Sequence, residues 1–599
     1  MTAAPPRPMY LPVDGATVFG TFHDASTWDE ATAVLICPPW GWDDVAAYRA
    51  LREWSIRLAA AGYPTLRIDL PGTGDSSGTP SDAGLVDAWV ASVTEAAAWL
   101  RAQPGVSRVA VIGLGIGGLI AGAAIDRGAP VDELVLWAAP TRSNSFVREQ
   151  RAFGAMQDTR VGLEGAPEGL PDGWLEVGGF LLSAATIDAI EGLDLRDLSA
   201  HGLRRVLVLD RDGMGRSPEL EANLERQGVA VAASPGNGWK AMVFHPERYE
   251  APLEVFRRIE GWLATGRTSA TGRSTATATS AAGIVPPAPA DRLRTGSADG
   301  RIVETPVRIP QPFGSLFGVL AQPEAEEPSS LCAVFLNAGA VRRIGPNRLW
   351  VEIARDWAAR GVPCVRMDLE GIGDADGDPD RYRNVGNFYT DEFGAQVGSI
   401  LDHLQGRGLG PRFILVGLCA GGYWAFHTGA ADQRVVAAFI LNPRAMIWDD
   451  GLLARREAHK VERLVEPAMW GRILRGEVAP ARMLAVSTAA AKSAAGAVAG
   501  VPGRLVGSRR SETTVDPTVT RFESLHDAGT RVLLAFADDE PVFDELEADG
   551  VIRRFGDWPN VTLEHLPGAD HTLRPVNAQT ALRALLDREL TEVLRDEPS

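Results

Sequence analysis

Cys419 stands in a segment whose composition suits a reactive residue. FILVGLCAGGYWAFHTGA (413–430) begins with an apolar run, passes through a glycine-rich turn and continues with helical character. The spacing Gly-x-Cys-x-Gly fits a sharp turn with a strained central residue, because only small residues fit on either side of it. Such a turn would place the Cys419 thiol at the N-terminus of the next helix, where the helix dipole favours a thiolate. The segment therefore predicts a cysteine nucleophile; the alternative is a small buried residue in a glycine-rich turn.

A histidine and a run of carboxylates near the C-terminus extend this pattern. His571 lies in VTLEHLPGADHTLRP (561–575), in a loop after an expected short strand. RVLLAFADDEPVFDE (531–545) ends another expected strand with consecutive acids that include Asp539 and Glu540. A histidine on a loop, oriented by a carboxylate, can take the proton of a nucleophile. The order along the chain is nucleophile, acid, histidine, so the sequence predicts a Cys-His-acid triad for acyl transfer.

The chain repeats itself over a long interval. LRIDLPGTGDSSG (66–78) matches VRMDLEGIGDADG (365–377), and VIGLGIGG (111–118) matches LVGLCAGG (415–422). Each copy has the same order: strand, helix, strand, DxxGxGD turn, helix, strand and glycine-rich turn. A repeat of this length indicates a duplicated domain rather than a solenoid.

Short apolar runs alternate with amphipathic helical stretches in both halves, the latter including residues 47–61 and 347–360. Strands that are apolar on both faces and separated by helices indicate a mostly parallel sheet. We therefore expect the α/β class, with two domains that are each a mostly parallel, doubly wound sheet. The expected strands are residues 33–37, 64–70, 109–114, 133–139 and 205–209 in the first half, and 332–338, 363–369, 413–418, 436–442 and 531–537 in the second.

The composition places the boundary between the two expected domains. Residues 265–292 are rich in Thr, Ser and Ala and end in a proline cluster, which is typical of a flexible linker. We expect one domain at residues 1–264 and the other at 293–599. Each half also has an insert, at about residues 141–203 and 443–525, at the place where a helical cap over an active site is expected.

Both halves resemble the α/β-hydrolase fold over nearly their whole length. The second half is similar to the serine-aminopeptidase-like bacterial hydrolases, including a group associated with exosortase systems. LNAGAVRRIGPNRLW (336–350), followed by RMDLEGIGD (366–374), carries this resemblance. The sequence departs from that group in having cysteine where serine is usual, but dienelactone hydrolases and some thioesterase-like members also use cysteine.

The resemblance assigns roles to particular residues of the second half. It implies that Cys419 is the nucleophile and His571 the base. It implies Glu540 as the acid, with Asp539 as the runner-up. The oxyanion donors would be the backbone N–H groups of Ala420, which directly follows the nucleophile, and of Ala340, after the first core strand.

The first half lacks this chemistry. Gly115 stands where the second half has its cysteine, and Trp239 stands where it has its histidine. Met214 stands where it has its glutamate, although Asp212 is near. CPPWGW (37–42) has prolines where oxyanion amides are expected, and proline has no N–H. We interpret this half as a catalytically dead copy that serves as a docking platform, a lid or a dimerisation surface.

Gly113-x-Gly115-x-x-Gly118 also permits a dinucleotide site in the first half. The strand before it is not the first of a βαβ unit, however, and the equivalent turn in the second half carries the cysteine. We therefore expect no cofactor. The DxxGxGD turns lack the Lys-Ser/Thr pair of a phosphate-binding loop and are interpreted as structural turns.

Composition excludes several classes of partner. The chain has 599 residues and a net charge of −18 without long Lys/Arg runs, which argues against nucleic acid and a polybasic membrane anchor. Its four cysteines contain no CxxC pair, so neither a metal site nor a disulfide framework is expected. The N-terminus has no apolar secretory region, and the most membrane-like stretch, 485–500, carries Lys492. We expect a cytoplasmic protein, and the sequence leaves open whether it forms a homo-oligomer.

Three functions remain open. The first is a cysteine-dependent acyltransferase or thioesterase whose partner is a small-molecule acyl donor, possibly bound to CoA or a carrier protein. The second is hydrolysis of an ester or lactone through the same triad. The third is a non-catalytic scaffold or binding protein in which Cys419 is merely tolerated.

Overall fold

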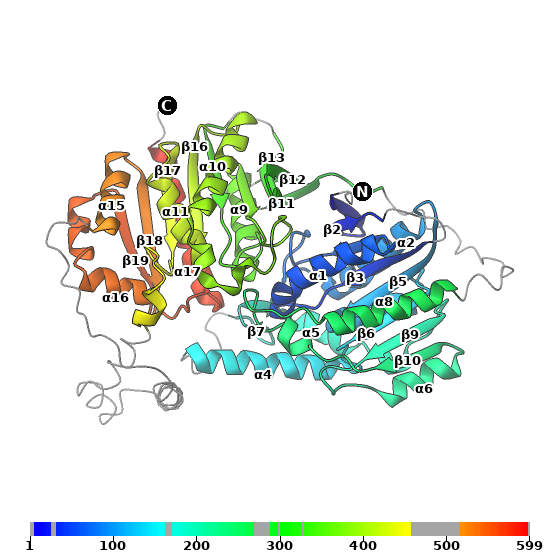
Figure 1. Cartoon of the computed structure of the whole chain (residues 1–599). Coiled ribbons are helices and arrows are strands. Elements are labelled where there is room, and N and C mark those ends of the chain that lie inside the picture. Colours follow the sequence, from blue (N-terminus) through cyan, green and yellow to red (C-terminus); the bar gives the residue numbers. More distant parts are fainter. Residues whose placement is uncertain are drawn as a thin grey trace, which may run out of the picture.

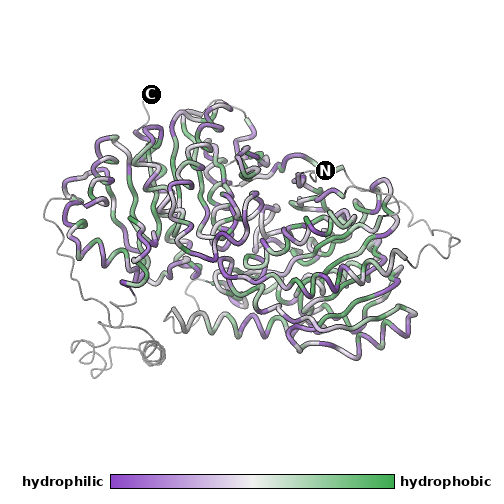
Figure 2. Tube along the Cα trace, in the orientation of Figure 1, coloured by the Kyte–Doolittle hydropathy of each residue, from purple (hydrophilic) through white to green (hydrophobic). Residues whose placement is uncertain are grey.

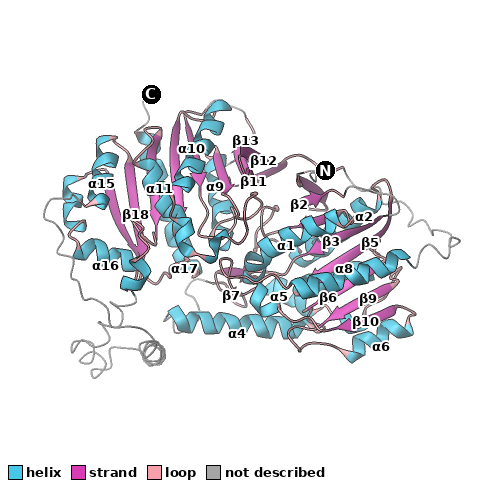
Figure 3. Cartoon of the chain, viewed as in Figure 1, coloured by secondary structure: helices cyan, strands magenta, loops and turns pink. Residues whose placement is uncertain are grey.

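The computed structural model describes residues 5–25, 31–161, 170–268, 288–297, 300–325, 329–456 and 516–596. These residues form two α/β halves that lie side by side (Figure 1). Each half has a central sheet with helices on either side (Figure 3). The strands are apolar along most of their length, whereas the polar residues gather on the outer turns and helix faces (Figure 2).

The first sheet has the strand order β1-β2-β4-β3-β5-β6-β9-β10. Its edge strands β1 and β2 form an antiparallel hairpin, β2 pairs antiparallel with β4, and all later neighbours pair parallel. The strands are β1 (Arg7–Val13), β2 (Ala16–His23), β3 (Ala31–Cys37), β4 (Thr65–Ile68), β5 (Val106–Leu114), β6 (Glu133–Trp137), β9 (Arg205–Leu209) and β10 (Ala230–Ser234).

The second sheet has the order β11-β12-β13-β15-β14-β16-β17-β18-β19, so its parallel strands are arranged as in the first sheet. The strands are β11 (Leu293–Ser297), β12 (Gly300–Gln311), β13 (Gly314–Pro323), β14 (Leu331–Phe335), β15 (Cys364–Asp368), β16 (Arg412–Leu418), β17 (Val435–Leu441), β18 (Arg531–Ala537) and β19 (Val561–Leu566). The expected α/β class with two mostly parallel, doubly wound sheets is confirmed. The antiparallel strands of each sheet were not predicted, because polar residues, prolines or glycines interrupt their apolar stretches.

Helices cover both faces of each sheet and bury two apolar layers per half. In the first half, α1 (Trp42–Ala60) and α8 (Leu253–Thr268) pack on one face, and α2 (Leu85–Arg101) and α3 (Ile116–Asp126) on the other. In the second half, α9 (Leu349–Ala359) and α17 (Val576–Arg595) lie opposite α10 (Asp391–Gly406), α11 (Ala420–Gly429) and α15 (Pro517–Asp527). The shorter helices are α6 (Pro218–Arg226), α7 (Trp239–Met242), α16 (Pro541–Ala548), and the 3-10 turns η3 (Pro346–Arg348), η4 (Arg381–Arg383), η5 (Val385–Phe388) and η6 (Ile552–Asp557).

The insert of the first half reaches the second half. It contains α4 (Ser143–Val161), the hairpin β7 (Leu175–Val177) and β8 (Phe180–Leu182), α5 (Ala184–Glu191) and η1 (Leu195–Asp197). At the hairpin turn, Gln579 Nε2 donates to Gly179 O at 3.0 Å, and Val576 N donates to Glu176 Oε1 at 3.0 Å. Of the corresponding insert in the second half, residues 457–515 lie outside the described part of the chain.

Both ends of the expected linker are tied to the first half. Helix α8 continues to Thr268, beyond the expected domain end at residue 264. Ala290 pairs with Tyr10 of β1 through two backbone hydrogen bonds of 2.9 and 2.8 Å. Residues 269–287, between these points, lie outside the described part of the chain.

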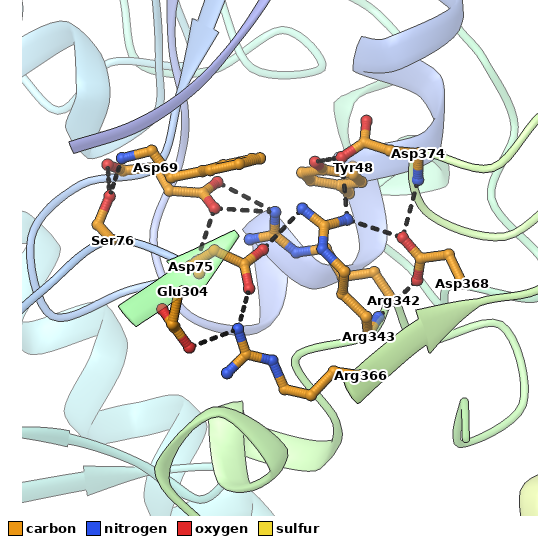
Figure 4. A network of polar contacts seen from close by, with 12 residues as sticks. Tyr48, Asp69, Asp75, Ser76, Glu304, Arg342, Arg343, Arg366, Asp368 and Asp374 are labelled. Atoms are coloured by element: carbon orange, nitrogen blue, oxygen red, sulfur yellow. Dashed lines mark hydrogen bonds and ion pairs between the residues drawn. The ribbon is translucent and has the colours of Figure 1, made fainter. Parts of the chain in front are cut away.

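The two DxxGxGD turns meet at the junction of the halves (Figure 4). Each turn is closed by its own first aspartate: Asp69 accepts from Asp75 N at 2.9 Å, and Asp368 accepts from Asp374 N at 3.0 Å. Each turn also makes an ion pair across the junction: Asp75 lies 3.0 Å from Arg366, and Asp374 lies 2.7 Å from Arg67. The prediction that these are structural turns was therefore incomplete, because it did not include their ion pairs between the two halves.

Two consecutive arginines cross the junction at the centre of this network (Figure 4). Arg343 lies 2.7 Å from Asp75 and 2.7 Å from Asp368, and all three side chains have 0% exposure. Arg342 lies 3.0 Å from both Asp44 and Asp69 of the first half. Charges buried this deeply are stable only while each keeps its partners. The two halves therefore complete each other's buried charge.

Candidate active site at the junction of the halves

Cys419 occupies a sharp turn between β16 and α11. Its backbone has φ 60° and ψ −116°, a conformation that is strained for any residue with a side chain. The neighbouring glycines permit this turn, since a Cβ on Gly417 would lie 2.1 Å from the carbonyl carbon of Gly421. A Cβ on Gly421 would lie 2.4 Å from Asn337 O. The sequence thus folds into the predicted strand, turn and helix, with the thiol only 7% exposed.

His571 and Glu540 meet as the sequence predicts. His571 lies in the loop between β19 and α17, and Glu540 directly precedes α16. Glu540 Oε1 lies 2.8 Å from His571 Nδ1. The carboxylate partner is thus Glu540 and not the runner-up Asp539, whose backbone has φ 61°. The neighbouring Asp538 has another role, since its Oδ2 accepts from Gly568 N at 2.7 Å.

The electrostatics of His571 link it to both of its partners. Burial lowers the pKa of this imidazole, but the charge and hydrogen bonding of Cys419 and Glu540 outweigh burial and raise it to about 10. At neutral pH the imidazole therefore keeps its proton beside the sulfur. The pKa of Tyr389 is raised well above its usual value, by burial first and then by Cys419.

Asn442 holds the loop that carries His571. It directly follows β17, with φ 40°, and its Nδ2 donates to the backbone carbonyl of His571 at 2.9 Å. Its Oδ1 accepts from Ala537 N at 2.7 Å, at the end of the strand that leads to the acid. One buried side chain therefore ties the loops of acid and base together. Sequence reasoning missed it, although a polar residue directly after an apolar strand was the available signal.

One expected oxyanion donor directly follows the cysteine, and the other lines the cavity at the cysteine. Ala420 is the first residue of α11, so its N–H has no acceptor within the helix. Ala340 follows β14 and lines the same cavity as Cys419 and His571. Between Ala338 and Ala340, Gly339 has φ 56° and forms the bend that turns the chain past the cysteine.

The cavity at Cys419 belongs to both halves. It has a volume of about 340 Å³, and its walls include Cys419, His571 and Ala340 from the second half. The first half contributes Trp42 and residues 244–248. Sequence reasoning could not find these residues, because nothing in their local pattern shows which distant segment they face.

The corresponding turn in the first half keeps its shape without a reactive side chain. Gly115 has φ 54° and ψ −127°, close to the angles of Cys419. A Cβ on Gly115 would lie 3.5 Å from the indole of Trp239, which is buried in front of the turn. The two residues therefore take the places that the cysteine and histidine alignments predicted. A cavity of about 490 Å³ remains beside them.

The expected match of Met214 to Glu540 is not supported by the loop contacts. The Met214 side chain is 62% exposed, whereas Asp212 accepts hydrogen bonds from Gly238 N and Lys240 N, on either side of Trp239. In the first half, the carboxylate that contacts the loop of Trp239, the counterpart of the His571 loop, is therefore Asp212. The alignment erred because the loop after β9 does not follow the spacing of its counterpart.

A family model for X-Pro dipeptidyl-peptidases of the S15 family matches residues 26–160, in the first half. No curated protein matches the chain. Similar solved structures include Est1E from Butyrivibrio proteoclasticus with ferulic acid bound, at 18% identity over 43% of this chain and 99% of that chain, with a TM-score of 0.32. The alpha/beta hydrolase GrgF from Penicillium sp. sh18 has 18% identity over 44% and 99%, with a TM-score of 0.32. A Pyrococcus furiosus esterase has 16% identity over 43% and 90%, with a TM-score of 0.30.

The family match and the strand order agree on an α/β-hydrolase fold. Among the helices that the structure describes, none is both long and apolar enough to span a membrane.

Proposed function

We propose that the second half is an acyl-transfer enzyme in which the acyl group passes through a thioester on Cys419. The observation that carries this proposal is that Cys419 and His571 line one cavity, with Glu540 2.8 Å from His571 Nδ1. The strained turn at the cysteine and the raised pKa of His571 support it further.

In the first step the Cys419 thiolate attacks the acyl carbonyl carbon. A carbon–sulfur bond forms and the carbonyl electron pair moves to oxygen, beside the N–H groups of Ala420 and Ala340. An oxyanion donor contributes about 2.7–4 kcal/mol in comparable enzymes. When the intermediate collapses, the bond to the leaving group breaks, and the His571 imidazolium gives that group its proton. The acyl group remains on sulfur.

In the second step neutral His571 takes a proton from the acceptor. The acceptor's oxygen, nitrogen or sulfur attacks the thioester carbon, and the bond to Cys419 breaks with its electron pair on sulfur. Glu540 keeps Nδ1 of the ring oriented throughout. A thioester donor, bound to CoA or to a carrier protein, suits this cycle because exchange between two thioesters is close to energy-neutral.

Hydrolysis of an ester is the second candidate function. It uses the same triad with water as the acceptor. The observation that favours it is the match of residues 26–160 to a hydrolytic family model, because the second half repeats the strand order of the half that matches. The first half takes no chemical part in either scheme, since Gly115 and Trp239 occupy the positions of nucleophile and base.

The deciding experiment is intact-protein mass spectrometry after mixing the full chain with a panel of acyl thioesters and activated esters. We expect an adduct on Cys419 that is absent from Cys419→Ala and slow to form in His571→Ala. Decay of the adduct with water, alcohols or amines separates hydrolase from transferase. An unreactive Cys419 with every donor would contradict the proposal and favour a scaffold.

A further inference from the structure

One loop of the first half forms a wall of the cavity at Cys419. Residues 244–248 line it, and they follow α7, whose first residue is Trp239. The loop is anchored within its own half: Glu247 N donates to His245 Nδ1 at 3.2 Å, and the His245 ring meets Trp42 edge-on at 6.2 Å between centroids. The segment that has Trp239 in place of a catalytic histidine in the first half thus continues into a wall of the cavity of the second half.

The cavity wall carries one carboxylate, that of Glu247, and two guanidinium groups, of which Arg248 is exposed to solvent. Glu247 comes from the first half, and Arg444 comes from the second half, two residues after Asn442. Both are half-buried. Among the described residues, neither the Glu247 carboxylate nor the Arg444 guanidinium has an ion-pair partner. Charged groups at the wall of a cavity are typical of sites that fix a charged ligand.

Glu247 lies against the turn that precedes the expected oxyanion donor. A Cβ on Gly339 would lie 2.4 Å from Glu247 Oε1, and Gly339 directly precedes Ala340. A free carboxylate there opposes the negative charge that develops on the acyl oxygen. A cation bound to Glu247 would cancel this opposition. The negative charge on the acyl oxygen is therefore stabilised most when the substrate itself carries a positive group that binds Glu247.

We infer that the cavity accepts a zwitterionic acyl group of the amino-acid type, whose ammonium is bound by Glu247 of the first half and whose carboxylate is bound by Arg444 of the second. This inference rests on the proposed acyl transfer at Cys419. It gives the first half a role in specificity, because it supplies one of the two recognition charges. A cavity of about 340 Å³ accommodates a small acyl group of this kind.

The test uses four thioesters of one small thiol, in which only the charges of the acyl group differ. β-Aspartyl carries both charges, 3-aminobutanoyl only the ammonium, succinyl only the carboxylate, and butanoyl neither. The rate of adduct formation on Cys419 is measured in the full chain and in Glu247→Gln and Arg444→Gln. Glu250→Gln is the matched control, an exposed glutamate on the same loop that does not line the cavity.

We expect the wild-type chain to react fastest with the β-aspartyl donor. Glu247→Gln should slow both ammonium-bearing donors by about 10- to 100-fold, the range of one charged hydrogen bond. The same variant should accelerate butanoyl transfer, because the opposing carboxylate is gone. Arg444→Gln should slow only the two carboxylate-bearing donors, and Glu250→Gln should slow none.

The outcomes separate the inference from the proposed function. Equal wild-type rates with all four donors, or a Glu247→Gln effect of the same factor on every donor, would overturn the inference and leave acyl transfer standing. No adduct with any donor in the wild-type chain would overturn both.

Discussion

Arg67 of the first half is paired with Asp374 of the second half at 2.7 Å. The same relationship recurs in reverse, since Arg366 of the second half is paired with Asp75 of the first at 3.0 Å. Arg67 and Arg366 are equivalent residues of the repeated motif, as are Asp75 and Asp374. Such reciprocal pairing is the contact pattern of a two-fold symmetric dimer, here formed within a single chain.

Asp75→Ala should strongly destabilise the junction. It leaves the buried guanidinium groups of Arg343 and Arg366 without one of their carboxylates. Breaking a buried ion pair typically costs about 3–5 kcal/mol, so we expect a loss of this size in the free energy of unfolding measured with denaturant. Asp87→Ala is the matched control, because its pairing with Arg127 is exposed and should matter by less than about 1 kcal/mol. A loss at Asp75 no larger than at Asp87 would contradict the prediction.

The same network predicts how stability depends on acid. Burial alone would raise the pKa of Asp75, but Arg343 and Arg366 hold it below its usual 3.8. Because the folded value lies below the unfolded one, the stabilisation is present above about pH 3.8 and is lost as pH falls through the folded value. Denaturant unfolding at several acidic pH values should show this loss in the wild-type chain and a smaller one in Asp75→Asn. The same pH dependence in both proteins would show that groups other than Asp75 cause the acid sensitivity.

Glu540→Gln should impair acylation without unfolding the protein. Glutamine keeps the shape of the side chain but not the charge that orients and stabilises the His571 imidazolium. Losing this charge in comparable triads lowers turnover by about 10²–10⁴-fold. Rapid-quench mass spectrometry of the Cys419 adduct measures the effect. Asp539→Asn serves as the control. Equal losses in the two variants would contradict the assignment of Glu540, rather than Asp539, as the acid.

Asn442→Ala should lower the acylation rate more than it weakens substrate binding. The variant removes the donor to His571 O and leaves Ala537 N without its acceptor. An unsatisfied buried group costs about 1–3 kcal/mol, which should appear in the free energy of unfolding. Asn442→Asp keeps the acceptor for Ala537 but not the donor to His571. It should therefore lower kcat with little change in KM. An unchanged kcat in Asn442→Asp would show that the loop needs no such support.

Removing the sulfur should lower the pKa of His571. In Cys419→Ala, burial still lowers this pKa and Glu540 still raises it, but the contribution of Cys419 is absent, so the value should fall from about 10. Nuclear magnetic resonance titration of the ring, assigned with His571→Gln, measures it. In the wild-type chain the folded value exceeds the ordinary 6.5, so the imidazolium's stabilising contribution is complete below pH 6.5 and is lost as pH rises through about 10. An unchanged pKa in Cys419→Ala would contradict the contribution of Cys419 to the pKa of His571.

Much of the fold was predictable because the local pattern of apolar residues indicates where the strands lie. Continuous apolar runs predicted the parallel strands, since a strand covered on both faces has no polar positions. The antiparallel strands escaped this search, because polar residues, prolines or glycines interrupt their apolar stretches. Within the site, the glycines beside Cys419 predicted its strained turn, because the steric demand is met by neighbours in sequence.

The sequence by itself determined the α/β class, the repeated order of elements and the residue types of the expected triad. Only the tertiary structure decided that Glu540, rather than Asp539, lies against His571, because the turn after β18 selects one of two adjacent carboxylates. Only it placed Glu247 beside Gly339, 92 positions later in the chain. Contacts of this kind depend on how the two halves pack, and that packing is set by buried charges whose partners lie far apart in sequence.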